Sequence, residues 1–153
     1  MSARTDMFDE LTLRLASING AVGGYNYSNR QASWTLFKLP DEVQHYPVTY
    51  LFADTTRNVG GQIGPNNQSD ELPVVIWGYI KAEREPHRVA ERFLEDMLKA
   101  IAKNRVTGGQ DLTLDQTCAA FLVTSKDISG DLTSERRTIE VILNVRLHGP
   151  VGG

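Results

Sequence analysis

The sequence predicts a single α+β domain, residues 1–153, in which a mixed or antiparallel sheet of about four strands carries two main helices on one face. Three observations predict it. The run Leu72–Ile80 is almost continuously apolar and rich in β-branched and aromatic residues, which fits a central strand buried on both faces. A helical pattern follows at Pro86–Asn104, and an alternating pattern occupies Thr138–Leu147. We therefore expect the second helix to cover one face of the central strand.

Two segments have the apolar periodicity of amphipathic helices. Apolar residues recur at spacings of three and four in Thr5–Asn19 and every four residues in Pro86–Asn104. Pro86 stands at a first-turn position, where proline is tolerated, and Lys99 and Lys103 lie where cations stabilise the helix dipole. The second helix would be roughly 27 Å long, enough to cross a sheet of four strands.

Further strand-like segments are short and rich in β-branched, aromatic or aliphatic residues. They are a brief Trp34–Lys38 and the longer Tyr46–Phe52 and Thr117–Lys126. A turn is expected at Asp127–Asp131, before the closing strand.

Three segments lack a periodic apolar face. Residues 53–71 are mostly polar and predict a long loop or a hairpin arm that projects from the sheet and becomes ordered on a partner. Gly20–Asn29 is predicted to be irregular, with its tyrosines as aromatic anchors, and Gly149–Gly153 is expected to be a frayed tail.

Composition restricts the classes of function. The net charge of -3 and the pI near 5.6 provide no positive field that would hold nucleic acid non-specifically. Cys118 is the only cysteine, so neither an intrachain disulfide nor a thiolate zinc cluster is expected. The first residues lack an apolar signal region, and the longest apolar run is too short to span a bilayer, so we expect a protein made in the cytoplasm without a membrane role.

The sequence offers no recognisable catalytic, cofactor or metal constellation. The glycine-rich Gly60–Pro65 is not followed by Gly-Lys-Ser/Thr, and the three histidines fall in unrelated segments. Cys118 in an apolar strand fits a small buried hydrophobe, and the tryptophans fit core or interface packing. We therefore predict no enzyme activity and no resident cofactor or metal.

The order and apolar pattern of the segments resemble the tail terminator, or tail completion, proteins of tailed bacteriophages. The resemblance is carried by Leu72–Trp77, by the helix Ala90–Leu98 and by the closing Arg137–Leu143. It covers most of the chain in layout, and its motifs are patterns of apolar residues.

The resemblance implies a structural virion protein. It would form a ring of six subunits that caps the tail tube, ends tail polymerisation and provides the interface to the head connector at the tail-neck junction. The implied partners are further copies of the chain, the tail tube protein, the neck or connector protein and a tail sheath protein. Genomic DNA would pass through the channel without specific binding.

Polar residues of the long loop and of the second helix are the candidate contacts with neighbouring subunits and partners. They are Arg57, Asn58, Gln62, Asn66, Asn67, Arg84, Arg88 and Arg92.

Two other functions stay open. Another phage neck or head-completion protein would differ in partner more than in fold. A small ligand-binding or enzymatic α+β domain would have its pocket under the second helix. The oligomeric state discriminates between a ring subunit and a monomeric ligand-binding domain.

Overall fold

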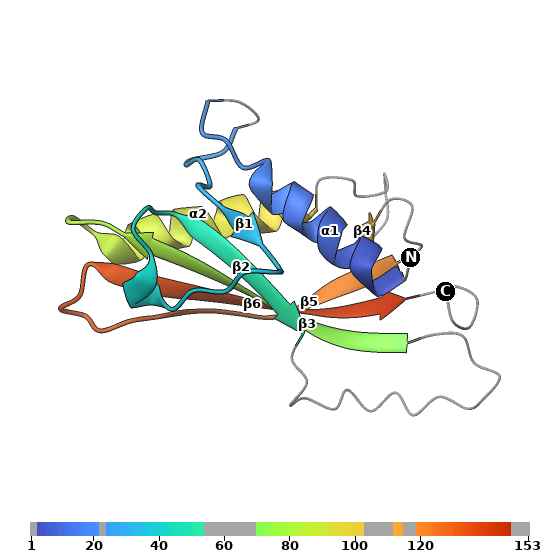
Figure 1. Cartoon of the computed structure of the whole chain (residues 1–153). Helices are drawn as coiled ribbons and strands as arrows, with labels where there is room; N and C mark the ends of the chain where they lie inside the picture. The colour runs from blue at the N-terminus through green and yellow to red at the C-terminus, as the bar shows by residue number, and fades with distance from the viewer. Residues whose placement is uncertain (1–2, 22–23, 54–69, 103–111, 115–118, 148–153) are drawn as a thin grey trace.

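The computed structural model describes residues 3–21, 24–53, 70–102, 112–114 and 119–147 (Figure 1). Its elements, in chain order, are α1 (Ala3–Ala16), β1 (Ala32–Ser33), the short 3-10 helix η1 (Pro40–Glu42), β2 (Val48–Ala53), β3 (Asp70–Lys81), α2 (Pro86–Ile101), β4 (Leu112–Leu114), β5 (Ala119–Ser129) and β6 (Arg136–Leu147).

The strands form one six-stranded sheet in the order β1-β2-β3-β6-β5-β4. The β1–β2 pair is parallel and the other pairs are antiparallel, so the sheet is mixed. Both helices lie on the same face of the sheet (Figure 1). The predicted α+β class is therefore confirmed. The strand number is higher than the predicted four because β1 and β4, with two and three residues, are too short to show a period.

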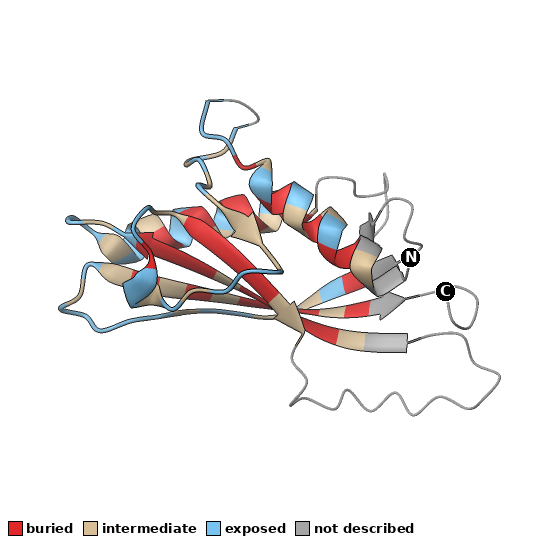
Figure 2. Ribbon diagram, viewed as in Figure 1, coloured by how far each residue is buried: buried red, intermediate tan, exposed pale blue. Residues whose placement is uncertain are grey.

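The central strand β3 is buried on both faces, as its apolar run predicts. Most of β3 is buried (Figure 2). Val74 and Ile76 face the helices and are 0% exposed, while Val75 and Tyr79 face the opposite side and are 3% and 1% exposed. β3 also pairs with β6 along its whole length, from Asp70 to Lys81. Both faces of this strand therefore have to be covered by other parts of the chain.

Proline is rare in central strands because it cannot donate to the ladder, yet Pro73 lies inside β3. The register explains its presence. β2 pairs with β3 only between Val74 and Tyr79, so Pro73 lies beyond the paired part of β2 and has β6 as its strand neighbour.

The main core lies between the helices and the sheet. Leu11 and Leu15 of α1 and Phe93 and Met97 of α2 are all 0% exposed. Gly78 of β3 lets α2 approach the sheet, because a Cβ atom there would lie 2.8 Å from the Met97 Sδ atom. At this point, where the ligand-binding alternative would place a pocket under the second helix, side chains fill the space.

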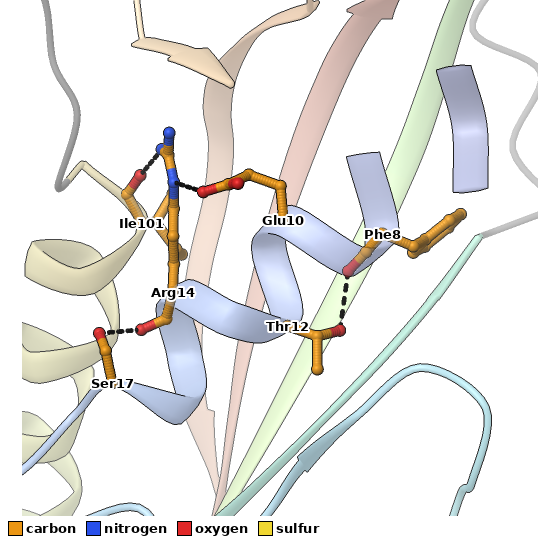
Figure 3. A network of polar contacts seen from close by, with 6 residues as sticks. All are labelled: Phe8, Glu10, Thr12, Arg14, Ser17 and Ile101. Atoms are coloured by element: carbon orange, nitrogen blue, oxygen red, sulfur yellow. Dashed lines mark hydrogen bonds and ion pairs between the residues drawn. The ribbon is translucent and has the colours of Figure 1, made fainter. Parts of the chain in front are cut away.

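A buried arginine joins the two helices (Figure 3). Arg14 is 2% exposed; its Nη1 donates to the Ile101 carbonyl at 2.6 Å and its Nε donates to Glu10 at 3.0 Å. Ile101 is the last residue of α2, where carbonyls lack intrahelical donors. The guanidinium therefore satisfies the end of α2 and fixes α1 beside it.

The segment after α1 is held against α2 by a buried carboxylate. Asp96, 2% exposed, accepts hydrogen bonds from the Asn26 backbone N–H at 2.8 Å, the Asn26 Nδ2 at 3.1 Å and the Tyr27 N–H at 2.9 Å. Tyr25 and Tyr27 pack partly buried on the core. This part of Gly20–Asn29 is irregular, with tyrosine anchors, as predicted.

The predicted strand at Trp34–Lys38 is wrong. The strand there is β1, which ends at Ser33, and the following segment packs through its side chains instead. Trp34 stacks on Phe8 of α1 with ring centroids 5.0 Å apart, whereas Phe37 lies 5.4 Å from Trp77 on the opposite face of the sheet. Aromatic packing on both sides of the sheet thus replaces strand pairing.

The turn predicted at Asp127–Asp131 is misplaced, because β5 continues to Ser129. The chain turns at Gly130, which has a φ of +149°. A Cβ atom at this position would lie 2.8 Å from the Arg136 carbonyl oxygen, so the turn excludes a side chain. Both helices also end earlier than predicted, at Ala16 and Ile101.

Several predictions fall partly or wholly outside the described residues. The two ends of the predicted loop belong to strands, because β2 ends at Ala53 and β3 begins at Asp70. The rest of the predicted loop, residues 54–69, lies outside the described residues. The same is true of Cys118 and of the predicted tail at Gly149–Gly153.

Replacing Arg14 with Met is expected to lower the free energy of unfolding by about 3 kcal/mol, because it leaves the Ile101 carbonyl and Glu10 without their buried donor. Urea denaturation followed by circular dichroism measures the change. Arg14→Lys keeps the positive charge but lacks the planar guanidinium that donates to both groups. Its free energy of unfolding should therefore lie between those of the parent protein and of Arg14→Met. An unchanged stability in Arg14→Met would contradict this role.

Replacing Asp96 with Ala is expected to lower the free energy of unfolding by about 2 kcal/mol, because three hydrogen bonds to a carboxylate are lost. Asp96→Asn, which keeps one acceptor oxygen, should lose less. The exposed neighbour Glu95 provides the matched control, since Glu95→Ala should change stability by no more than about 0.5 kcal/mol. Equal losses of stability at both positions would contradict the role of the Asp96 carboxylate in holding Asn26 and Tyr27 against α2.

Candidate functional site

The predicted contact residues divide into two groups. Five lie outside the described residues: Arg57, Asn58, Gln62, Asn66 and Asn67. The other three are exposed: Arg84 lies two residues before α2, and Arg88 and Arg92 lie on α2. We call these three the arginine surface.

The arginine surface is weakly tied to the rest of the chain. Arg88 approaches Glu85 at 3.6 Å, but both side chains are more than 60% exposed, so water screens the pair. The backbone carbonyl of Arg92 accepts a hydrogen bond from Asn26, and the Arg92 guanidinium takes no part in this contact. Exposed glutamates lie among the three arginines: Glu83, Glu85, Glu91 and Glu95. The surface therefore carries charges of both signs, and the use of its arginines in subunit contacts stays a prediction.

The two histidines that the structure describes lie in different parts of the fold. His45 is exposed before β2, His87 is exposed at the start of α2, where it lies 3.6 Å from Glu91, and His148 lies outside the description. Among the described residues, no three His, Cys, Asp or Glu side chains gather in a group that could hold a metal. Within the same residues, no helix is both long and apolar enough to span a membrane.

The helix-free face of the sheet carries a cluster of rings, which we call the aromatic face: Phe37, Tyr50, Phe52, Trp77 and Tyr79. Trp77 is central, with ring centroids 5.2 Å from Phe52 and 5.4 Å from Phe37. Trp77 and Tyr79 are two residues apart in β3, as are Tyr50 and Phe52 in β2, and Tyr50 is paired with Trp77. The four side chains therefore project to the same side of the sheet.

Part of this side of the molecule is exposed apolar surface. Phe37 is 44% exposed and its neighbours Leu36 and Leu39 are 44% and 52% exposed. Single exposed apolar residues are ordinary, but three within four positions beside an aromatic cluster are typical of an interaction surface.

A groove of about 400 Å³ opens beside the aromatic face. It is lined by Leu39, Pro40, Trp77, Asp127, Ser129, Thr138 and Glu140. The indole Nε1 of Trp77 donates to Glu140 at 2.9 Å, and Glu140 lies directly opposite Asp127 in the β5–β6 register. The groove therefore combines apolar walls with two carboxylates.

A second hollow, of about 420 Å³, has the opposite charge. Its lining includes three basic side chains, Arg30, Lys38 and His45, together with Gln31, Gln44, Val43, Val48 and Tyr50. Tyr50 donates its hydroxyl proton to Gln31 at 3.2 Å. None of the lining residues is acidic, so the hollow suits an anionic group.

Two phenols of the aromatic face are hard to ionise. Burial raises the pKa of Tyr79 well above its ordinary value, and the negative charges that Tyr50 and Glu42 can carry raise it further. Burial and the Glu42 carboxylate also raise the pKa of Tyr50. The Tyr79 hydroxyl donates to the Lys38 carbonyl at 2.8 Å, which joins the segment before η1 to the sheet.

Sequence reasoning missed the aromatic face as a unit. A signal for it exists, because Tyr50 and Phe52, and likewise Trp77 and Tyr79, are two residues apart in segments that are correctly predicted as strands. The groove is harder to find, since the sequence predicts a turn at Asp127 and only the extension of β5 brings this residue opposite Glu140.

The sequence matches no known protein-family model and no curated protein sequence.

The raised pKa values predict how the protein responds to alkali. In an absorbance titration, two of the five tyrosines, Tyr50 and Tyr79, should ionise at a higher pH than the value of about 10 that is ordinary for tyrosine. Tyr79→Phe should remove one of these two late-ionising groups. Above that pH the unfolded chain releases protons that the folded chain retains, so stability should fall as pH rises. Simultaneous ionisation of all five phenols near pH 10 in the folded protein would contradict this.

Proposed function

We propose that the chain is a structural subunit that forms a ring of six copies on the end of a phage tail tube, where it ends tail polymerisation and provides the interface to the neck. One observation carries the proposal: the molecule has two unlike exposed surfaces on opposite sides of its sheet. One is the charged outer side of α2, where Arg88 and Arg92 are exposed with Glu91 and Glu95, and the other is the apolar surface around Phe37 and Leu39.

Two unlike surfaces on opposite sides suit a head-to-tail assembly. In such an assembly one patch of a subunit contacts a different patch of the next, and the contacts close into a ring when the rotation between copies permits. A symmetric dimer would instead pair one patch with itself. The α+β architecture agrees with the fold that the resemblance to tail terminators implies.

The mild net charge of -3 supports the same proposal. A ring through which DNA passes must not hold it, and the chain lacks the excess of Lys and Arg that non-specific binding requires. Tail tube, neck and sheath proteins would contact the ring at surfaces outside the subunit contacts. Another neck or head-completion protein would satisfy the same observations with a different partner.

A ligand-binding domain is the second candidate, and the hollow lined by Arg30, Lys38 and His45 favours it. Three basic groups around about 420 Å³ would suit a small anion or an acidic side chain. In that case the purified protein should be a monomer that binds a small anion saturably.

The proposed function predicts the mass of the purified protein. Light scattering, with and without tail tubes, should give six times the 17.0 kDa of one chain, either in solution or only on tube ends, and negative-stain images should show rings. A monomer or dimer that does not bind tail tubes would contradict the proposal and favour the ligand-binding domain.

A further inference from the structure

We infer that the hollow lined by Arg30, Lys38 and His45 binds a small molecule through a phosphate group. The inference goes beyond the proposed ring and does not depend on it, because a ring subunit can carry such a site as well as a monomer can. It deepens the second candidate function, since it names the class of ligand and the residues that hold it.

The basic groups of the hollow have no counter-charge in its lining. Arg30 is exposed and Lys38 is partly exposed, and neither takes part in an ion pair among the described residues. None of the lining side chains is a carboxylate. The Tyr50 phenol stays neutral at ordinary pH, because burial and the Glu42 carboxylate raise its pKa. The lining therefore holds two permanent cations and a histidine, and no anion.

Two acidic residues of η1 lie close to these groups in the sequence, but neither lines the hollow. The Glu42 carboxylate accepts a hydrogen bond from the Leu39 backbone N–H at 2.8 Å, and Asp41 is exposed. Neither of them forms an ion pair with a basic residue among those described. They reduce the positive potential around the hollow without neutralising its cations directly.

Hydrogen bonds hold the backbone at both permanent cations. The Arg30 N–H donates to the Pro47 carbonyl at 2.8 Å. The Lys38 carbonyl accepts from the Tyr79 hydroxyl, also at 2.8 Å. Both side chains therefore start from anchored positions, which lowers the conformational entropy that is lost when a ligand binds.

The donors of the hollow fit a phosphate group. A guanidinium can donate two parallel N–H groups to phosphate oxygens, and a lysine adds a point charge. Gln31 accepts from Tyr50 through its Oε1 at 3.2 Å, and its Nε2 donors are unused among the described residues. A phosphate on an organic molecule carries a charge of about -1.5 to -2 and three acceptor oxygens. It matches both cations, whereas a carboxylate with a single charge would leave one cation unmatched.

The size of the hollow indicates that the ligand is more than a free phosphate ion. Its volume of about 420 Å³ lies in the range of small-molecule sites, which is roughly 300–1,000 Å³. Val43 and Val48 provide apolar walls, and Gln44 provides a further amide. A nucleic acid does not suit the site, because the net charge of -3 gives no field to hold a polyanion. The ligand class is therefore a small organic phosphate.

Isothermal titration calorimetry with ribose 5-phosphate, in a phosphate-free buffer of low ionic strength, tests the inference. We expect saturable binding of one ligand per chain and no binding of ribose, which lacks the phosphate. Inorganic phosphate distinguishes the sources: weaker binding than ribose 5-phosphate assigns a role to the organic part, and equal binding identifies free phosphate as sufficient. If neither phosphate saturates the protein at about 10 mM, or if ribose binds equally well, the inference is overturned.

Variants show whether the phosphate occupies this hollow. Arg30→Gln and Lys38→Met should each weaken binding by about tenfold, because each removes a charged donor. Arg88→Gln and Lys126→Gln are the matched controls, since each removes one exposed positive charge outside the hollow, and both should bind like the parent protein. Circular dichroism checks folding, and Arg30 is exposed, so Arg30→Gln keeps the test valid if Lys38→Met does not fold. Equal weakening in the controls would overturn the site.

Light scattering on the same samples separates this inference from the proposed function. A ring of six that binds ribose 5-phosphate supports both, and a ring that binds neither phosphate overturns the site and leaves the ring standing. A monomer that binds the sugar phosphate but not tail tubes supports the site and overturns the ring. A monomer that binds neither phosphate nor tail tubes overturns both.

Discussion

The double burial of β3 is the constraint on which the rest of the structure depends. It pairs with β2 at one edge and with β6 at the other, and apolar side chains project from both of its faces, so neither face can remain in water. The helices cover one face, where Gly78 permits close contact with Met97. The opposite face is covered by aromatic packing, and the chain crosses to that side between Trp34 and Phe37.

Because the two faces of the sheet are covered by different kinds of packing, the two sides of the molecule differ chemically. Helices bury their apolar stripes and present charge outward, which places the arginine surface on one side. The aromatic packing is incomplete, since Phe37 and Leu39 remain about half exposed and border an acidic groove. Two chemically different surfaces on opposite sides are what a head-to-tail assembly requires.

Strong periodicity made the main elements predictable. The apolar runs of α1, α2, β3 and β6 gave the α+β class and the double burial of β3, because a sequence period reports directly on burial. The short edge strands, the path of Trp34–Lys38 and the length of β5 depend on contacts between distant residues, which a local pattern does not contain. The same holds for the buried Arg14 and Asp96 and for the Asp127–Glu140 pair.

Peptide-level hydrogen exchange, compared between dilute and assembled protein, tests the central claim most directly. The claim is that β3 is covered within one chain, whereas the surface around Phe37 and the groove is covered by another. The account predicts that Asp70–Lys81 exchanges slowly in both states, while peptides containing Leu36–Pro40 and Asp127 gain protection only on assembly. Fast exchange of β3 in dilute protein, or unchanged exchange at Leu36–Pro40 on assembly, would contradict it.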